Sequence, residues 1–285
     1  MKSKYICVGV MATVRLLCRK ILSKLILILK IDLNPILFYY TNPEKNSKEP
    51  PPPSTIPEHL HSDFTMNNQI PILYWYFDER NDFKTNNSAK DYKKAFKKLE
   101  NRTFKYSNYG KDINSFYAAF EKYNLKGKSV LIWGLVGLNC EAMAIWQGAE
   151  HVYVVDYNKP VCEHSKITVM NHEELMKSGI KTDVAISFSS FEHDGLGRYG
   201  DPLNPNGDLE AMQIAKNFLK DDGFMLFGVP QGKDCLVWNA HRIYGEIRLP
   251  LLLKGWKTEA VFEQESPVGK PLGMYHIQPL MVLRK

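Results

Sequence analysis

The stretch S-V-L-I-W-G-L-V-G-L-N-C-E, residues 129–141, decides the fold class of this chain. It begins with a short apolar run, which is typical of a strand buried on both faces of a parallel sheet. Gly134 and Gly137 then permit a tight turn and the close approach of a ligand to the backbone. A helix is predicted to follow over 138–148, with its N-terminus at the turn. The glycine spacing matches neither the dinucleotide-binding nor the P-loop fingerprint.

The sequence on either side continues the alternation of helix and strand. A helix opened by Asp112 precedes the stretch, and buried strands are predicted at 151–156 and 183–189. Asp208 is expected to cap a helix that ends at Gly223. The last three predicted strands are F-M-L-F-G-V-P, K-T-E-A-V-F-E and M-Y-H-I-Q-P-L-M-V-L, the final two as an antiparallel pair. This order predicts an α/β fold with a doubly wound, mostly parallel sheet and helices on both faces.

The carboxyl ends of the predicted strands carry the candidate ligand-binding residues, because ligands of such sheets bind at this edge. Asp156 ends the second strand, about twenty residues after the glycine turn, where a carboxylate can accept hydrogen bonds from a ribose diol. The glycine turn and Asp156 together indicate a cofactor that contains adenosine. The alternative is that no cofactor binds here. In that case the glycines only allow the turn to pack, and Asp156 is a solvent-exposed residue at the end of a strand.

The segment S-S-F-E-H-D-G-L-G-R-Y-G-D-P-L-N-P-N-G-D, residues 189–208, is too long for a plain connection. Its glycines and prolines exclude a regular helix or strand. Phe191, Leu196 and Tyr199 are interleaved with its charged residues, which argues against disorder. We therefore expect this loop to cover or build an active site.

Three segments carry a resemblance to a known family: V-L-I-W-G-L-V-G-L-N-C-E-A, Y-V-V-D-Y and F-E-H-D-G-L-G-R-Y-G-D-P-L-N-P-N-G-D. Over residues 70–285 the chain resembles class I S-adenosylmethionine-dependent methyltransferases, and within them the methyltransferase-like family of unknown function numbered 268. The resemblance implies a Rossmann-like, seven-stranded sheet with a C-terminal antiparallel hairpin, and S-adenosylmethionine as cofactor. The cofactor-binding residues that it implies are Gly134, Gly137, Glu141, Asp156, Tyr157, Ser189 and Ser190.

The chain departs from the usual methyltransferase pattern in two respects. The usual run of alternating glycines is reduced to Gly134 and Gly137. An acidic residue normally stands two positions before the first glycine, and here that position is Ile132. Glu141, in the following helix, is expected to substitute in part. These departures keep open a second interpretation, a methyltransferase-like binding module without catalytic activity.

Methyl transfer to a hydroxyl requires that the acceptor be positioned and that its proton be removed. His193 is the preferred general base, with Glu192 or Asp194 orienting it or binding the acceptor. His241, placed in a helix after the strand F-M-L-F-G-V-P, is a second acid/base candidate. The alternative for His193 is a loop histidine whose hydrogen bonds go to neighbouring backbone.

Four further residues are candidates for substrate binding. Arg198, Tyr199 and Asp201 offer polar contacts of the kind that carbohydrate recognition requires, although Arg198 and Asp201 could instead pair with each other and lock the loop. Trp238 could stack on a sugar face, although an aromatic residue at such a position is more often part of a core.

The charge of the chain is concentrated at its N-terminus. Residues 1–30 hold seven of the 37 basic residues and no acidic one, so residues 31–285 carry 30 basic against 31 acidic side chains. A nearly neutral body argues against a nucleic-acid partner. Residues 1–40 are predicted to associate with a membrane, as an amphipathic interfacial helix or as a signal-anchor.

Residues 41–69 contain a run of prolines and charges, which predicts an extended, solvated linker over 41–59 before the domain at 70–285. The triplets at Asn86 and Asn101 fit the glycosylation acceptor pattern. Five scattered cysteines indicate neither a disulfide framework nor a metal site. By analogy, an anchor followed by a stem suggests a type II single-pass protein of the Golgi or endoplasmic reticulum lumen.

The sequence thus predicts an enzyme, an S-adenosylmethionine-dependent O-methyltransferase that modifies a sugar hydroxyl of a glycan, for example a fucose. Besides the non-catalytic module, a methyltransferase on the cytosolic membrane surface that acts on a lipid or small molecule stays open. The acceptor and the oligomeric state do not follow from the sequence.

Overall fold

The computed structural model describes residues 51–80, 85–105, 113–134, 138–262 and 276–285, which belong to one compact unit, Lys45–Lys285. The predicted membrane-associating segment 1–40 and the first part of the linker lie outside these residues. So do Asp112 and Gly137. Among the described residues, no helix is both long and apolar enough to cross a membrane.

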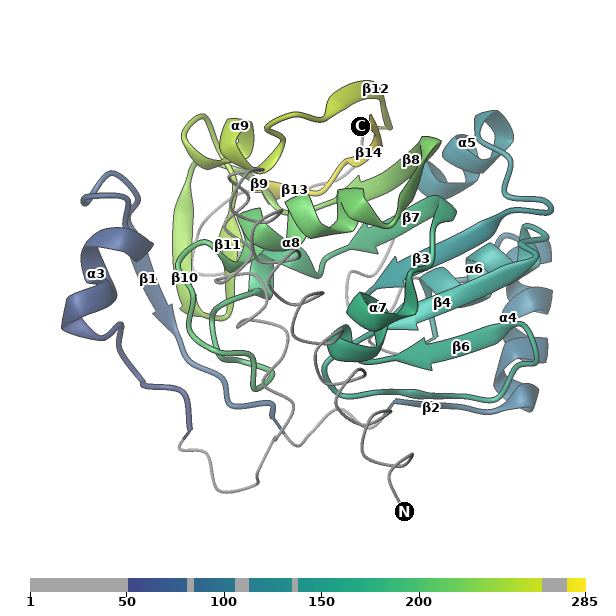
Figure 1. The fold of residues 1–285 in the computed structure, drawn as a ribbon, viewed down its shortest axis with the longest axis horizontal. Coiled ribbons are helices and arrows are strands. Elements are labelled where there is room, and N and C mark those ends of the chain that lie inside the picture. Colours follow the sequence, from purple (N-terminus) through teal and green to yellow (C-terminus); the bar gives the residue numbers. More distant parts are fainter. Residues whose placement is uncertain (1–50, 81–84, 106–112, 135–137, 263–275) are drawn as a thin grey trace, which may run out of the picture. The chain divides into compact units, whose positions relative to one another are not determined.

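The centre of the unit is a seven-stranded sheet (Figure 1). All its neighbouring strands run parallel, except that the last strand of the chain is antiparallel to both of its neighbours. In spatial order the strands are β12 (Lys257–Phe262), β14 (Leu280–Arg284), β8 (Leu219–Gly228), β7 (Thr182–Phe188), β3 (Ser129–Trp133), β4 (His151–Val155) and β6 (Ile167–Met170). The predicted doubly wound sheet with its C-terminal antiparallel hairpin is confirmed.

Strand β3 lies in the middle because both of its faces are apolar. Val130 and Ile132 are fully buried in the core cluster that contains the helices on one face of the sheet. Trp133 packs the other way, with its ring 5.5 Å from that of Phe191 and 5.5 Å from that of His172. A strand covered on both sides requires apolar residues at every position, and the run at 130–133 has them.

Helices cover both faces of the sheet (Figure 1). Two of them begin with capping boxes, in which the side chains of Ser88 and Asn171 accept from the backbone three residues on. The helices on the far face in this view are α4 (Ala89–Glu100), α5 (Asn114–Lys122) and α6 (Cys140–Trp146), and those on the near face are α7 (His172–Ser178) and α8 (Gly207–Asn217).

A second, three-stranded sheet is built from parts of the chain that are distant in sequence. It contains β1 (Ile72–Trp75), β10 (Cys235–Asn239) and β11 (His241–Ile243), in that order. Strands β10 and β11 belong to the connection between β8 and β12, which also holds α9 (Arg248–Leu252). Short two-stranded pairs join β2 (Asn86–Asn87) to β5 (Val161–Cys162) and β9 (Gln231–Gly232) to β13 (His276–Ile277).

The residues just before β1 pack against this second sheet. Pro52 and Ile56 are buried, and helix α3 (Glu58–Phe64) inserts Phe64 edge-on against Trp238 with ring centroids 5.1 Å apart. The expected solvated linker over 41–59 therefore does not extend through residues 51–59. The apolar side chains between its prolines have a core to join, so ordering this segment removes apolar surface from water.

Three sequence-based assignments of secondary structure need correction. Asp208 lies inside the first turn of α8 rather than at its cap, because its carboxylate is bound to buried arginines. The helix ends at Asn217, and residues 219–223 already belong to β8. His241 stands in strand β11, not in a helix, because the apolar run at 235–240 pairs with β1.

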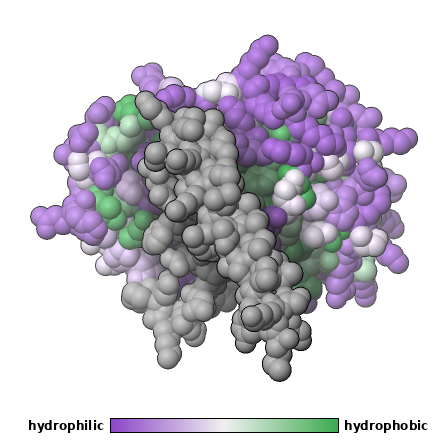
Figure 2. All heavy atoms as spheres, viewed as in Figure 1, coloured by the Kyte–Doolittle hydropathy of each residue, from purple (hydrophilic) through white to green (hydrophobic). Residues whose placement is uncertain are grey.

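On the face shown in Figure 2, hydrophilic residues cover most of the described surface, and apolar residues gather in smaller groups. Across the described ranges, no group of three or more histidine, cysteine or acidic side chains is arranged to hold a metal ion.

Candidate functional site

The candidate site lies where the strand order reverses. From β3, the chain continues to β4 and β6 on one side and to β7 and β8 on the other, so the switch point falls between β3 and β7. In doubly wound sheets, ligands bind outside the carboxyl ends of the strands at this point. The residues that follow β3, β4 and β7 are Gly134, Asp156 and Ser189, which are all among those predicted.

Gly134 joins the ends of these three strands. Its N–H donates to the carbonyl of Val155, at 2.8 Å, which ties β3 to β4. Its φ is +80°, and a Cβ at this position would lie 2.2 Å from Oγ of Ser190, after β7. Only glycine fits this conformation and this contact. The turn therefore packs directly on the segment that begins the long loop.

Asp156 lies half-buried at the end of β4. Its Oδ1 accepts a hydrogen bond from the backbone N–H of Asn158, at 2.7 Å, which fixes the carboxylate at the strand end. Tyr157 follows and packs its ring on His172, with centroids 4.2 Å apart. A half-buried carboxylate next to the switch point is placed where a ribose diol could bind.

Glu141 is fully buried in the first turn of α6. One carboxylate oxygen accepts from Nδ2 of Asn87, at 2.9 Å, and from the hydroxyl of Tyr92, at 3.4 Å. The other accepts from the backbone N–H of Asn139, at 3.0 Å. Burial raises the pKa of Glu141 to about 7. The first oxygen thus holds α6 to β2 and α4, and the second binds the residue at the N-cap position of α6 itself. Ile132, at the usual acidic position, is a core residue.

The long loop starts with a short 3-10 helix, η1 (Phe191–His193), and most of its first half is buried. Oγ of Ser189 donates to Oε1 of Glu192, at 2.6 Å. Among the described residues, Oε2 of Glu192 has no hydrogen-bond partner although it is buried. Burial raises the pKa of Glu192 to about 7. A buried carboxyl oxygen without a partner is costly, which makes this oxygen a candidate ligand contact.

His193 lies beside Glu192 and is held in one orientation. Its Nδ1 is 2.6 Å from the carbonyl oxygen of Ala240, which can only accept, so Nδ1 carries the proton. Nε2 is therefore the acceptor nitrogen, 3.7 Å from Oε1 of Glu192. Burial, helped by the positive charge of Arg198, lowers the pKa of His193 well below its usual range. The imidazole is neutral at pH 7 and can accept a proton.

The remaining charged residues of the loop hold its shape. Asp201 accepts from the backbone N–H groups of Gly197 and Tyr199, at 3.0 and 3.2 Å. Arg198 does not pair with Asp201, as the alternative supposed, but with Glu79, at 2.6 Å, and it also donates to the Ala240 carbonyl. Asp201 therefore stabilises the loop through backbone N–H groups of the loop itself, and Arg198 stabilises it through Glu79.

Asp194 is buried as well, and burial raises its pKa well above the usual range of a carboxyl group. The neighbouring carboxyl of Asp201 adds to this effect. The backbone carbonyl of Asp194 accepts from Nη1 of Arg242, at 2.6 Å. The structure thus places Asp194 next to a buried polar network that sequence reasoning did not find.

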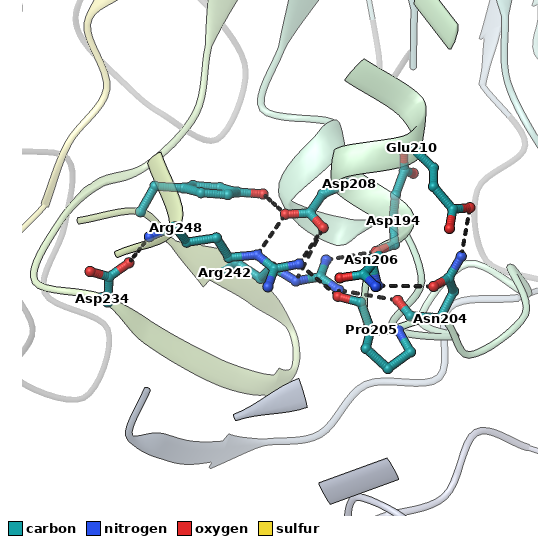
Figure 3. A network of polar contacts seen from close by, with 10 residues as sticks. Asp194, Asn204, Pro205, Asn206, Asp208, Glu210, Asp234, Arg242 and Arg248 are labelled. Carbon is teal, nitrogen blue, oxygen red and sulfur yellow. Dashed lines mark hydrogen bonds and ion pairs between the residues drawn. The ribbon is translucent and has the colours of Figure 1, made fainter. Parts of the chain in front are cut away.

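This network joins the long loop, α8 and the connection between β8 and β12 (Figure 3). Asp208 on α8 binds Arg248 through two hydrogen bonds, at 2.9 and 2.5 Å, and accepts from the hydroxyl of Tyr244, at 2.9 Å. Arg242 lies 3.8 Å from the same carboxylate. Asp234 accepts from the backbone N–H of Arg248 and so caps α9. The arginines also donate to backbone carbonyls of residues 194, 204 and 205.

Two of the predicted site residues occupy different surroundings from those expected. Trp238 is 0% exposed and donates from Nε1 to the carbonyl of Pro53, at 3.1 Å, so it is a core residue and not a sugar-stacking one. His241 lies near the site, with its ring centroid 6.3 Å from that of His193. Gly137 lies outside the described residues.

The strand order, with one reversed strand before the sheet edge, is that of a class I methyltransferase fold. The sequence also matches the family "Caenorhabditis protein of unknown function, DUF268" over residues 127–279. The chain belongs to this family, and the matched residues contain the glycine turn, the long loop and the connection between β8 and β12.

Comparison with solved structures finds distant likenesses. "Putative hemolysin from Streptococcus thermophilus" has a TM-score of 0.42 at 14% identity, over 60% of this chain and 64% of the other, so less than two thirds of that chain is spanned. TehB from Haemophilus influenzae has a TM-score of 0.42 at 13% identity, over 67% of each chain. The N-methyltransferase NodS from Bradyrhizobium japonicum has a TM-score of 0.42 at 10% identity, over 60% and 93%. A search of curated proteins finds no match.

Proposed function

We propose that this chain is an S-adenosylmethionine-dependent methyltransferase that acts on a hydroxyl group. The observation that carries the proposal is the grouping of residues at the switch point of the sheet. There the Gly134 turn packs on Ser190, Asp156 ends the neighbouring strand, and Glu192 and His193 follow within three residues. The proposal assigns cofactor binding and proton acceptance to groups at this one edge of the sheet.

The residues present suit the adenosine part of the cofactor. Asp156, half-buried at the end of β4 with its Oδ1 accepting from the N–H of Asn158, lies where a carboxylate would meet the hydroxyls of a ribose. The Gly134 turn and Ser190 would lie along the methionine part. Oε2 of Glu192, buried and without a partner among the described residues, adds an acceptor or, when protonated, a donor at the same edge.

When bound, S-adenosylmethionine supplies a methyl group on a positively charged sulfur, so that the acceptor oxygen forms a bond to carbon as the carbon–sulfur bond breaks. The hydroxyl proton must leave. Nε2 of His193 is unprotonated at pH 7 and accepts it, because Nδ1 is committed to the Ala240 carbonyl. Glu192, 3.7 Å away, stabilises the resulting imidazolium when it is ionised.

The finer proposal is that the acceptor is a sugar hydroxyl of a glycan. It is supported by the nearly neutral charge of residues 31–285, which offers nothing to a polyanion. It is also supported by Asn86 and Asn101, which fit the glycosylation pattern and are both exposed, as asparagines modified in the secretory pathway must be. We accordingly propose a lumenal location, with residues 1–40 at a membrane.

One observation favours a second candidate, a carbohydrate- or ligand-binding module without catalysis. Ile132 replaces the usual acidic residue and is fully buried in the core, so it cannot contact a cofactor. Both oxygens of Glu141 are engaged in hydrogen bonds within the chain. In this case the fold would be retained and methyl transfer would be lost.

The test is methyl transfer by the full chain, with S-adenosylmethionine labelled in its methyl group and neutral methyl pyranosides as acceptors. His193→Asn keeps a donor for the Ala240 carbonyl and removes Nε2. We expect it to lower the transfer rate by about 10²–10⁴-fold without weakening cofactor binding. His59→Asn, at an exposed position on α3, is the matched control. Cofactor binding without transfer to any acceptor would favour the module instead.

A further inference from the structure

A row of aromatic rings runs from the protein surface to His193. The ring of Trp75 lies 4.9 Å from that of Phe77 and 6.4 Å from that of His241. The His241 ring lies 6.3 Å from that of His193. On its other side, the His193 ring meets Tyr199 edge-on, at 5.4 Å. Neighbouring rings at these separations are in contact.

Exposure changes along this row. Trp75 is 44% exposed, His241 is partly buried, and His193 is 8% exposed. A large aromatic side chain that stays this exposed at the outer end of the row is available to a ligand. A ligand lying on Trp75 can therefore extend past His241 toward the acceptor nitrogen of His193.

Strand β1 presents Trp75 on the face that leads to the site. Leu73 is paired with Val237, and Val237 with His241, so Trp75 shares a face with His241. Tyr74 points to the opposite face of β1 and is 55% exposed. Three exposed aromatic residues, Tyr74, Trp75 and Tyr76, thus follow one another in sequence, and of these Trp75 is the one whose ring contacts the ring row.

The charged groups around the row are paired with one another. Arg198 packs over the Phe77 ring, with its guanidinium carbon 4.3 Å from the ring centroid, and binds Glu79 at 2.6 Å. Arg80 binds Asp78 through two hydrogen bonds, at 2.7 and 2.8 Å. Aromatic rings and compensated charges offer a surface without a net charge, which suits a neutral ligand better than an anion or a cation.

We propose that Trp75 is the acceptor-stacking residue of this site and that it binds the apolar face of a neutral pyranose. A sugar ring has C–H groups on its faces and hydroxyls at its edge, which matches a flat indole beside His241 and His193. The inference rests on the proposed function, since it names the substrate class and a specificity residue for it. It also transfers to Trp75 the stacking role that the sequence suggested for the buried Trp238.

The experiment is a titration of the full chain with methyl α-L-fucopyranoside and with methyl β-D-galactopyranoside. Binding is detected by saturation-transfer NMR, in the presence and absence of S-adenosylmethionine. Methyl β-D-glucuronide serves as an anionic comparison. The variants are Trp75→Ala, Trp75→Phe and the control Tyr74→Ala, which removes a more exposed ring from the other face of β1. S-adenosylmethionine affinity is measured for each variant by calorimetry.

We expect a neutral pyranoside to bind, Trp75→Ala to weaken it about tenfold, Trp75→Phe to weaken it less, and Tyr74→Ala to leave it unchanged. S-adenosylmethionine affinity should be the same in all variants. Equal losses for Trp75→Ala and Tyr74→Ala would overturn the proposal, as would preferential binding of the glucuronide or no binding of the neutral sugars. If sugar binding follows Trp75 but S-adenosylmethionine does not bind, the proposed function fails, and of this inference only the sugar-binding role of Trp75 is kept.

Discussion

Replacing Asp208 by asparagine removes the carboxylate that pairs with both buried arginines, Arg242 and Arg248. The side chains of Asp208, Arg248 and Arg242 are 0%, 3% and 3% exposed, so neither guanidinium can recover water. The asparagine amide also directs N–H groups at the donors of Arg248. Breaking a buried ion pair from one side costs about 3–5 kcal/mol, and we expect a loss of this size in the free energy of unfolding.

The assay is urea unfolding of the full chain, followed by fluorescence at neutral pH. The matched control is Glu259→Gln, which breaks the ion pair between Glu259 and Arg284. The two charged atoms are 2.6 Å apart, but the side chains of Arg284 and Glu259 are 34% and 36% exposed. Breaking this exposed pair should lower the free energy of unfolding by about 0–1 kcal/mol. Adding Arg248→Met to Asp208→Asn should restore part of the stability, because it removes one uncompensated charge. A loss for Asp208→Asn no larger than that of the control would refute the reasoning.

Two further predictions concern residues whose surroundings are now defined. Trp238→Ala should lower the free energy of unfolding by about 3–5 kcal/mol, because it removes a buried core aromatic side chain. Trp75→Ala, at an exposed position, should change it by less than about 0.5 kcal/mol. Thermal unfolding of both variants measures the two changes. Glu192 has a pKa of about 7 in the folded chain against 4.5 for a free side chain, so its contribution to stability is full below pH 4.5 and is lost as the pH rises through about 7. Glu192→Gln should therefore lose less stability than the native chain between about pH 5 and about pH 8 in urea titrations, and an unchanged pH dependence would contradict the pKa.

The central strands could be predicted from the sequence because each is a short local run. Apolar residues at every position of 130–133 indicate burial on both faces, whatever the rest of the chain does. Strand β6 and helix α7 were not predicted, since Ile167–Met170 is only half-buried and shows neither an apolar run nor a clear alternation. The second sheet was missed for a different reason, because β10 pairs with β1 from far upstream.

The sequence predicts which residues belong to the candidate site, but not how their charged groups pair. The composition of the 189–208 loop indicated a functional segment, and His193 and Glu192 do lie together there. Its charge partners are remote in sequence: Arg198 binds Glu79, 119 residues away, and Asp208 binds Arg248, 40 residues away. Long-range pairs of this kind leave no local pattern, so a single sequence could not assign them.

The measurement that tests the account most directly is calorimetric titration of the full chain with S-adenosylmethionine. Asp156→Asn keeps an oxygen for the N–H of Asn158 and removes the charge that would bind the ribose. The control is Asp221→Asn, at a fully exposed carboxylate. The account predicts saturable binding that Asp156→Asn weakens at least about tenfold and that the control leaves unchanged. Absence of binding to the folded native chain, or equal binding by Asp156→Asn, would contradict a cofactor site at this edge of the sheet.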